Sequence, residues 1–104
     1  MKIRKILVLK EVADDLNEGR FFYERKEQGI GDYFFDSIIS DIESLKLYGG
    51  IHNKKFGFYR MLAKRFPFAI YYKMDGDIIK VIAVLDMRRN PSWIRKKLGK
   101  RRKK

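Results

Sequence analysis

The spacing of the apolar residues changes at Gly49-Gly50, and this change constrains the fold more than any other feature of the sequence. Before the glycine pair, apolar residues recur every three to four positions, as on one face of a helix. After it, they form short runs at residues 58–63, 68–74 and 78–87 that have the composition of β-strands. The pattern favours a domain in which helices pack on strands.

The first half of the chain predicts one strand and two helices. Residues 2–9 are rich in aliphatic and β-branched side chains and predict a strand. Residues 11–27 carry a helical stripe, and the segment QGIG at 28–31 ends that helix because glycine readily adopts left-handed conformations. A second helix starts near Asp32, which is a good N-cap, and ends at Gly49. A link this short predicts an antiparallel helical hairpin.

The second half predicts three consecutive antiparallel strands. The turn Asp75-Gly76-Asp77 joins the last two strands as a tight hairpin. Pro67 has no N–H for a strand ladder, so it marks the gap between the first two. The order of elements is therefore β-α-α-β-β-β. We predict an α+β fold in which the helical hairpin packs on one face of a mainly antiparallel, twisted sheet.

A short C-terminal helix follows the last strand. Asn90 caps it and Pro91 fits the first helical position, so the helix covers Ser92–Leu98. Trp93 is expected to anchor this helix on the sheet, assisted by Ile94 or Leu98, and stacking on a nucleic-acid base is the alternative role for its ring.

The length and composition predict one domain with a basic tail. With 104 residues, of which 45% are hydrophobic, the chain can build a single core, which we place in residues 1–98. Residues 94–104 contain eight basic residues and no acid. The last part, residues 99–104, is therefore expected to be disordered when unbound.

Strand alternation assigns the side chains of the last strand to two faces. The wholly apolar set is assigned to the face covered by the helical hairpin, and it consists of Ile79, Val81, Ala83, Leu85 and Met87. The other set is assigned to the opposite face, and it consists of Ile78, Lys80, Ile82, Val84, Asp86 and Arg88.

The charge is concentrated in the second half of the chain. The net charge is +12 overall; residues 1–50 contribute −2 (eight cations, ten acids) and residues 51–104 contribute +14 (seventeen cations, three acids). Such a surface attracts polyanions, either nucleic acid or an acidic protein.

The cations at the strand ends form the candidate site. Arginine donates paired hydrogen bonds to phosphate or carboxylate, which lysine cannot copy. The predicted target- or nucleic-acid-binding surface combines Trp93 with a cluster of cations: Arg60, Lys64, Arg65, Arg88 and Arg89. A purely structural role, for example pairing with Asp86, is the alternative for any single arginine. Three acids cannot neutralise seventeen cations, and this favours a functional cluster.

Several classes of site are disfavoured by the residues present. There is no cysteine, which excludes disulfides and thiol chemistry. No grouping of His, Asp or Glu has metal-ligand spacing, so we expect neither a metal nor a cofactor. His52 lies in a glycine- and lysine-rich segment and is expected to be solvated. The apolar run at residues 6–9 is too short for a signal peptide or a membrane span, so a cytoplasmic protein without membrane contact is expected.

Two segments resemble the RelE/ParE toxin superfamily. The stretch RFPFAIYYKMDGDIIKVIAVLDMRRNPSW at residues 65–93 resembles its carboxy-terminal half. The segments FFYE at 21–24 and YFFDSIISDIESL at 33–45 resemble its opening helices. The similarity covers about residues 2–93 and leaves out the basic tail.

The resemblance implies a growth-inhibiting toxin of a type II toxin-antitoxin pair, of the kind associated with plasmid stabilisation. Its partner would be a cognate antitoxin with an acidic segment, matched in charge to the basic toxin. The superfamily divides by target. ParE-type members inhibit DNA gyrase, whereas RelE-type members cleave messenger RNA on the ribosome.

RNA cleavage would need a group that moves protons as well as cations that stabilise charge. Arg60, Arg88 and Arg89 suit the second task, but arginine is a poor proton carrier at neutral pH. The histidine that often precedes the terminal arginine in the family is replaced by Asp86 or Met87.

Lys64, Tyr71 or Asp86 remain as candidates for the proton transfer, so enzymatic activity stays open. The missing histidine disfavours it. The favoured hypothesis is a non-enzymatic ParE-like toxin. A RelE-like messenger endoribonuclease is the first alternative, and a basic RNA-binding module is the second.

Overall fold

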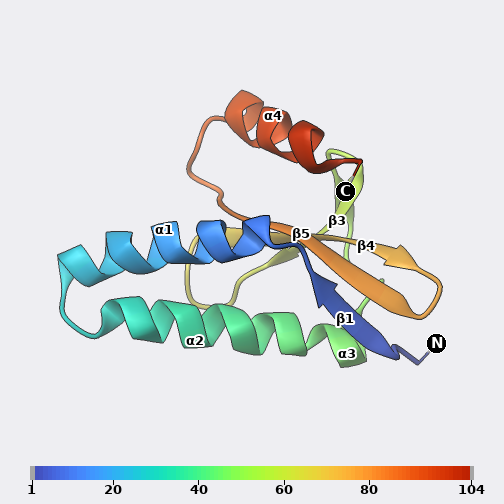
Figure 1. Cartoon of the computed structure of the whole chain (residues 1–104), viewed down its shortest axis with the longest axis horizontal. Helices are drawn as coiled ribbons and strands as arrows, with labels where there is room; N and C mark the ends of the chain where they lie inside the picture. The colour runs from blue at the N-terminus through green and yellow to red at the C-terminus, as the bar shows by residue number, and fades with distance from the viewer. Residues whose placement is uncertain (1, 104) are drawn as a thin grey trace.

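The computed structural model describes residues 2–103 and has the predicted α+β architecture (Figure 1). Its elements are, in chain order, β1 (Lys5–Val8), α1 (Glu11–Lys26), α2 (Ile30–Glu43), α3 (Leu45–Tyr48), β2 (Lys54–Lys55), β3 (Phe58–Leu62), β4 (Phe68–Asp75), β5 (Ile78–Asp86) and α4 (Pro91–Arg101). The short elements α3 and β2 add to the predicted order β-α-α-β-β-β, and the predicted C-terminal helix is α4.

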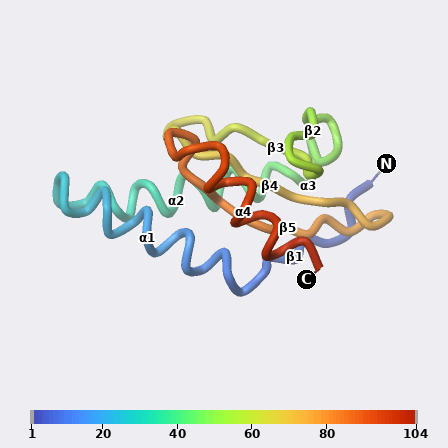
Figure 2. Tube along the Cα trace, turned by 90° about the horizontal axis from the view of Figure 1, so that it is seen from above, coloured from blue at the N-terminus to red at the C-terminus, as the bar shows by residue number. Residues whose placement is uncertain are grey.

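The sheet has five strands in the order β1-β5-β4-β3-β2. β1 pairs with β5 in parallel, and the other three pairs are antiparallel, so the sheet is mainly antiparallel as predicted. α1 and α2 lie side by side against one face of the sheet, and α4 crosses the other face (Figures 1 and 2). We call these the hairpin face and the α4 face.

The helical hairpin begins its second helix earlier than predicted. α2 starts at Ile30, after Gly29 with φ of 92°, so Asp32 lies in the first turn and is not the N-cap. The carboxylate of Glu24 accepts hydrogen bonds from the backbone N–H groups of Gly29 and Gly31 at 2.9–3.1 Å. This carboxylate satisfies N–H groups at the start of α2 that the helix itself leaves unpaired.

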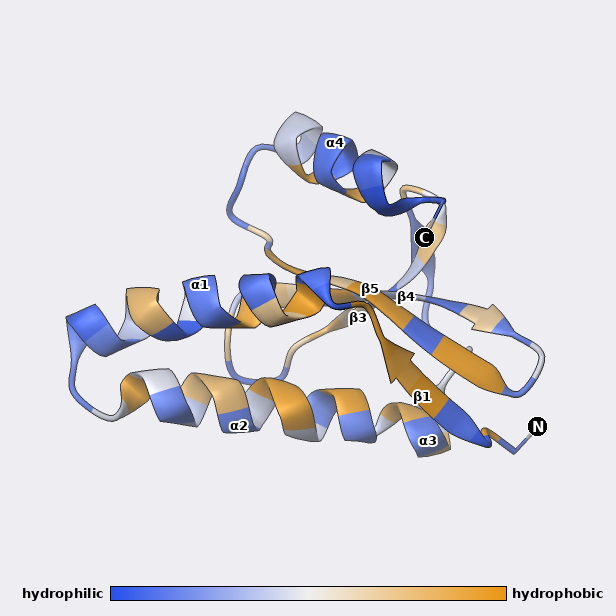
Figure 3. Cartoon of the chain, viewed as in Figure 1, coloured by the Kyte–Doolittle hydropathy of each residue, from blue (hydrophilic) through white to orange (hydrophobic). Residues whose placement is uncertain are grey.

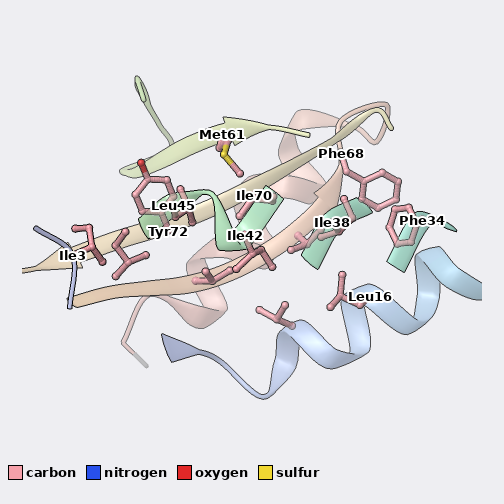
Figure 4. Packing of buried hydrophobic residues seen from close by; sticks show 14 residues of the cluster. Ile3, Leu16, Phe34, Ile38, Ile42, Leu45, Met61, Phe68, Ile70 and Tyr72 are labelled. Atoms are coloured by element: carbon pink, nitrogen blue, oxygen red, sulfur yellow. The ribbon is translucent and has the colours of Figure 1, made fainter. Parts of the chain in front are cut away.

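Each face of the sheet carries its own apolar core. On the hairpin face, α1, α2 and α3 bury a cluster whose members include Leu16, Phe34, Ile38 and Leu45 (Figure 4). On the α4 face, Ile94 and Leu98 of α4 are buried, and the apolar side of this helix faces the sheet (Figure 3). Trp93 is only half-buried, so Ile94 and Leu98 anchor the helix and Trp93 assists, which reverses the prediction.

A β-bulge interrupts the alternation of β5. Tyr71 of β4 pairs with Ala83, and the next residue, Tyr72, pairs with Val81, so Ile82 is an extra residue on β5. A bulge of this kind moves the following side chains of its strand to the opposite face.

The bulge makes part of the predicted face assignment wrong. Ile79, before it, lies on the hairpin face as predicted. After it, Ala83 and Leu85 pack on the α4 face, and Val84 packs on the hairpin face, opposite to the prediction. Met87 lies beyond the end of β5 and is exposed, so it does not contact the hairpin as predicted.

The last helix extends into the segment that was predicted to be a disordered tail. α4 runs to Arg101, three residues beyond the predicted end at Leu98; Lys104 lies outside the described residues. Arg101 is buried, and its Nη1 and Nη2 donate to the two carboxylate oxygens of Asp15 at 2.7 and 2.8 Å. Its Nη1 also donates to the carbonyl of Ile82 at 3.0 Å. This long-range ion pair supplies the ordering energy that the basic segment lacks in isolation.

The β2–β3 hairpin holds the same helix end from the other side. Its turn residue Phe56 has φ of 57°, which is uncommon for an aromatic residue, and Gly57 follows with φ of 86°. The carbonyl of Phe56 accepts a hydrogen bond of 3.0 Å from Arg102, whose guanidinium carbon lies 4.9 Å from the ring centre of Phe58. α4 is thus fixed between α1 and this hairpin.

Replacing Arg101 with methionine should strongly destabilise the fold. The change leaves the buried carboxylate of Asp15 without its cation, which typically costs about 3–5 kcal/mol. Unfolding in urea measures the loss, and Lys100→Met, an exposed change in the same helix turn, is the matched control with an expected effect below about 0.5 kcal/mol. Equal stability of the two variants would contradict this role of the pair.

Two helical glycines should respond in opposite ways to alanine. A Cβ at Gly99 would meet no atom within 4 Å, so Gly99→Ala should stabilise the protein by about 0.5–1 kcal/mol through helix propensity. A Cβ at Gly19 would lie 2.5 Å from the Phe34 ring, so Gly19→Ala should be destabilising. Thermal unfolding of both variants tests the packing of α1 on α2 and the open surface of α4.

Candidate functional site

The structure does not gather the predicted basic cluster at one site, although Arg60 and Lys64 both border a cavity of about 540 Å³ beside α2, α3 and β3. Arg60 lies on the α4 face, because it pairs across the strands with Tyr71, which belongs to the core under α4. Arg88 and Arg89 lie at the other side of α4, next to α1. Lys64 and Arg65 lie in the loop between β3 and β4. The backbone N–H of Lys64 donates to the carboxylate of Asp41 in α2, which places this residue toward the helical hairpin.

The strongest candidate site is a cleft between the β2–β3 hairpin, the sheet and α4, which we call the Arg60 cleft. Its volume is about 190 Å³, and it is lined by Lys55, Phe56, Arg60, Tyr71, Met87, Pro91, Ile94 and Arg95. Three different elements contribute one cation each, and none of the lining residues is acidic. The cleft is therefore suited to a phosphate or carboxylate group.

Sequence reasoning identified Arg60 and Tyr71 but missed the other two cations of the cleft. Lys55 and Arg95 approach the ring of Phe56, with the Lys55 Nζ and the Arg95 Cζ each 5.3 Å from its centre. Such contacts restrict long side chains without neutralising them. Both cations are thus held at the cleft with their charges available to a ligand.

Tyr71 contributes a phenol to the floor of the cleft. Burial raises the pKa of Tyr71, and the neighbouring Arg60 opposes this rise through its charge and a hydrogen bond. Because the pKa stays above its ordinary value, the hydroxyl remains protonated at neutral pH. Tyr71 can therefore donate a hydrogen bond to an anion but is a weak proton acceptor.

Arg88 is occupied by an ion pair. Its Nε and Nη2 donate to the two carboxylate oxygens of Asp86 at 3.0 and 2.8 Å, and its backbone N–H donates to the same group at 2.9 Å. Burial alone would raise the pKa of Asp86, but the hydrogen bonds and charge of Arg88 outweigh it, and the pKa is lowered. Arg88 therefore has the purely structural role, pairing with Asp86, that was the alternative to ligand binding for a single arginine.

Arg89 and Trp93 border a second cleft of about 390 Å³ between α1 and the start of α4. The Arg89 Cζ lies 3.9 Å from the ring centre of Trp93, and the Lys97 Nζ lies 5.2 Å from it. The walls also include the acids Asp15, Glu18 and Asp86, the apolar residues Gly19, Phe21, Phe22, Phe68, Val84 and Leu85, and the cation Arg25. This cleft is mixed in charge, unlike the Arg60 cleft.

His52 was predicted to be a solvated loop residue, and the structure shows that this prediction is wrong. It is half-buried, and its Nδ1 lies 2.5 Å from the Tyr72 hydroxyl, which also accepts a hydrogen bond from the N–H of Gly50. Burial lowers the pKa of His52. The residue borders a third cavity, of about 540 Å³, beside α2, α3 and β3. Sequence reasoning missed the contact because its partners are twenty residues apart and no local motif joins them.

Neither a metal site nor a membrane span is found in the described part of the chain. Residues 2–103 contain no group of three or more His, Cys, Asp or Glu side chains arranged to hold a metal ion. None of the helices in this range is long and apolar enough to cross a bilayer.

Comparison with known proteins supports the fold. A scan against models of protein families and a search of curated proteins give no match. Among solved structures, the chain is similar to a chain of the chromosomal ParDE TA system from P. aeruginosa. The TM-score is 0.70 at 14% sequence identity, and the similarity covers 79% of this chain and 94% of that chain. The protein therefore shares the fold of that chain, and the α+β fold class that its sequence predicted is confirmed.

The sole histidine allows a direct test of the His52 contact. Burial lowers the pKa of the folded state below the unfolded value of about 6.5, so protonation opposes folding. The stability that comes from keeping the His52 ring neutral is complete above the unfolded pKa, and it is lost as the pH falls through about 6.5 toward the folded pKa. An NMR titration should give a midpoint below that of the urea-unfolded chain, and a midpoint at or above the unfolded one would refute the burial of the ring. His52→Asn should have a flatter dependence of stability on pH over this window.

Proposed function

We propose that this protein is a ParE-like toxin of a type II toxin-antitoxin pair, which inhibits an essential cytoplasmic target and is neutralised by a cognate antitoxin. DNA gyrase is the target that we favour. The observation that carries the proposal is the fold, because the similarity to the ParDE TA system covers nearly the whole of the other chain. The Arg60 cleft adds a concentrated cationic site on this fold.

The groups around the candidate arginines favour binding over catalysis. Asp86 stands where the family often has histidine, and its carboxylate is held by Arg88 with a lowered pKa, which makes it a poor proton carrier. Tyr71 has a raised pKa and is a poor base. Strand cleavage needs both a proton acceptor and a proton donor near neutral pH. These environments support inhibition by binding and disfavour a RelE-like ribonuclease.

An antitoxin with an acidic segment matches the charge of the described surface. The Arg60 cleft carries three cations without an acid, and the second half of the chain has a net charge of +14. A disordered acidic segment would be attracted at long range and would fold as it docks. We propose that such a segment covers the Arg60 cleft and competes there with the target.

Induced expression in bacteria should arrest growth, and the purified protein should inhibit supercoiling by gyrase. Arg60→Lys keeps the charge but removes the planar fork, so half-inhibition should require at least roughly tenfold more protein, the equivalent of about 1.4 kcal/mol. Arg4→Lys is the matched control, because Arg4 is exposed and pairs with Asp77 in the β4–β5 turn. Its inhibition should be unchanged.

The same assays separate the alternatives. Codon-spaced cuts in messenger RNA on translating ribosomes would contradict gyrase inhibition and support the RelE-like mechanism. In that mechanism Arg60, Arg88 and Arg89 would stabilise charge. Lys64 or Tyr71 would transfer the proton. Absence of growth arrest would exclude both toxin mechanisms and leave the basic RNA-binding module.

A further inference from the structure

The outward side of α4 is a basic surface that meets the Arg60 cleft only at Arg95. Ile94, Leu98 and Arg101 point toward the sheet and are buried. We call the following exposed cations the α4 basic face: Arg95, Lys96 and Lys100 of α4, with Lys103 just beyond the end of the helix. Arg102 is also exposed, but it is bound to the β2–β3 hairpin. The hydrophilic outer side and the apolar inner side of the helix are visible in Figure 3.

The α4 segment itself carries no negative charge. Residues 87–103 contain no aspartate or glutamate. The acids near this end of the helix belong to α1: the charges of Glu11 and Asp14 act on Arg101, and the buried Asp15 binds it through both of its carboxylate oxygens. The four exposed cations therefore repel one another, and a bound polyanion would relieve this repulsion.

The cations at the edges of this face are held in place by contacts that leave their charge intact. Arg95 lies against the ring of Phe56, and Arg102 lies over Phe58 while it donates to the Phe56 carbonyl. On the opposite edge, Lys97 lies against Trp93. Such ordering reduces the entropy that these side chains lose when a ligand binds.

The spacing of the three outward lysines suits one strand of a nucleic acid. Lys96 and Lys100 lie four residues apart on one side of α4, and Lys103 follows three residues later in the turn after the helix, so the three lysines form a short row. At 1.5 Å per residue the row is roughly 10 Å long. A nucleic-acid strand in a duplex has one phosphate per 3.4 Å of axis, so a row of this length is long enough to contact several phosphates of one strand.

The composition of the face distinguishes a nucleic acid from a protein partner. Protein interfaces have an apolar centre in which lysine is depleted, whereas interfaces with nucleic acid are polar and strongly positive. The other exposed positions of α4 are Pro91, Ser92 and Gly99, so no aromatic or large aliphatic side chain lies among them. We propose that the α4 basic face binds the phosphate backbone of nucleic acid, independently of base sequence. This inference goes beyond the proposed toxin function and does not depend on it.

The test measures binding to labelled oligonucleotides of mixed sequence, about 20 nucleotides long, over a range of salt concentrations. Lys96, Lys100 and Lys103 are replaced together by glutamine, which is a good helix former. Each lost phosphate contact lowers the slope of log K against log salt by about 0.7 for single strands and 0.9 for duplexes. The triple variant should therefore lose about two units of slope on single strands, and its affinity at low salt should fall at least tenfold.

A second triple variant has the same net charge but leaves α4 intact. Lys5, Lys10 and Lys46 are exposed on β1, at the start of α1 and on α3, and their replacement by glutamine should change the slope by less than about 0.5. Circular dichroism confirms that both variants keep the fold. Single-stranded RNA, single-stranded DNA and duplex DNA are compared to determine which nucleic acid supplies the backbone.

Two results would overturn the inference. Equal loss of slope in the two triple variants would show that binding follows net charge and not the α4 basic face. Competition by polyglutamate as effective as that of an unlabelled oligonucleotide of equal charge would identify an acidic protein as the occupant. Growth arrest is measured separately, so an α4 variant that still arrests growth but has lost the binding separates this surface from the proposed toxin function.

Discussion

The buried ion pair between Asp15 and Arg101 joins the helical hairpin, the sheet and the C-terminal helix α4. β1 ends opposite Val81, so from Ile82 onward β5 has no strand partner on that edge among residues 2–103. The carboxylate of Asp15 accepts the N–H of Val84, and Arg101 donates to the carbonyl of Ile82. The pair thus satisfies backbone groups that would otherwise be buried without partners, and it ties α1 and α4 to the bulged strand.

The candidate site depends on this arrangement. One wall of the Arg60 cleft is formed by the first half of α4, through Pro91, Ile94 and Arg95. The position of that half is fixed by the packing of Ile94 and by the ion pair at the far end of the helix. A helix held at both ends can keep a cation at a fixed distance from Arg60, and a loosely attached tail cannot.

The sequence predicted the order of elements because the apolar spacing, the turn at Gly76 and the cap at Asn90 are local features. Asn90 indeed accepts the N–H of Ser92, as a capping residue does. The bulge at Ile82 was not predicted, because the run IIKVIAVLDM has apolar residues on both faces of the strand. A shift in the alternation of its side chains therefore does not change the apolar pattern of the sequence. The ordered end of α4 was not predicted, because Asp15, the partner of Arg101, is 86 residues away in the sequence. The cleft was predicted only through Arg60 and Tyr71, since Lys55 and Arg95 come together only in the folded chain.

Two kinds of contact order many of the described cations, and these contacts have different consequences for function. Arg4, Arg20, Arg88 and Arg101 pair with carboxylates, and their charge is largely used in holding the fold. Lys55, Arg89, Arg95 and Arg102 instead lie against aromatic rings, which order a side chain without cancelling its charge. Most of this second group surrounds α4, so ordered positive charge gathers around the helix. An anionic partner would meet cations that are already positioned, and for this reason α4 and the cleft beneath it are where we locate the function of the protein.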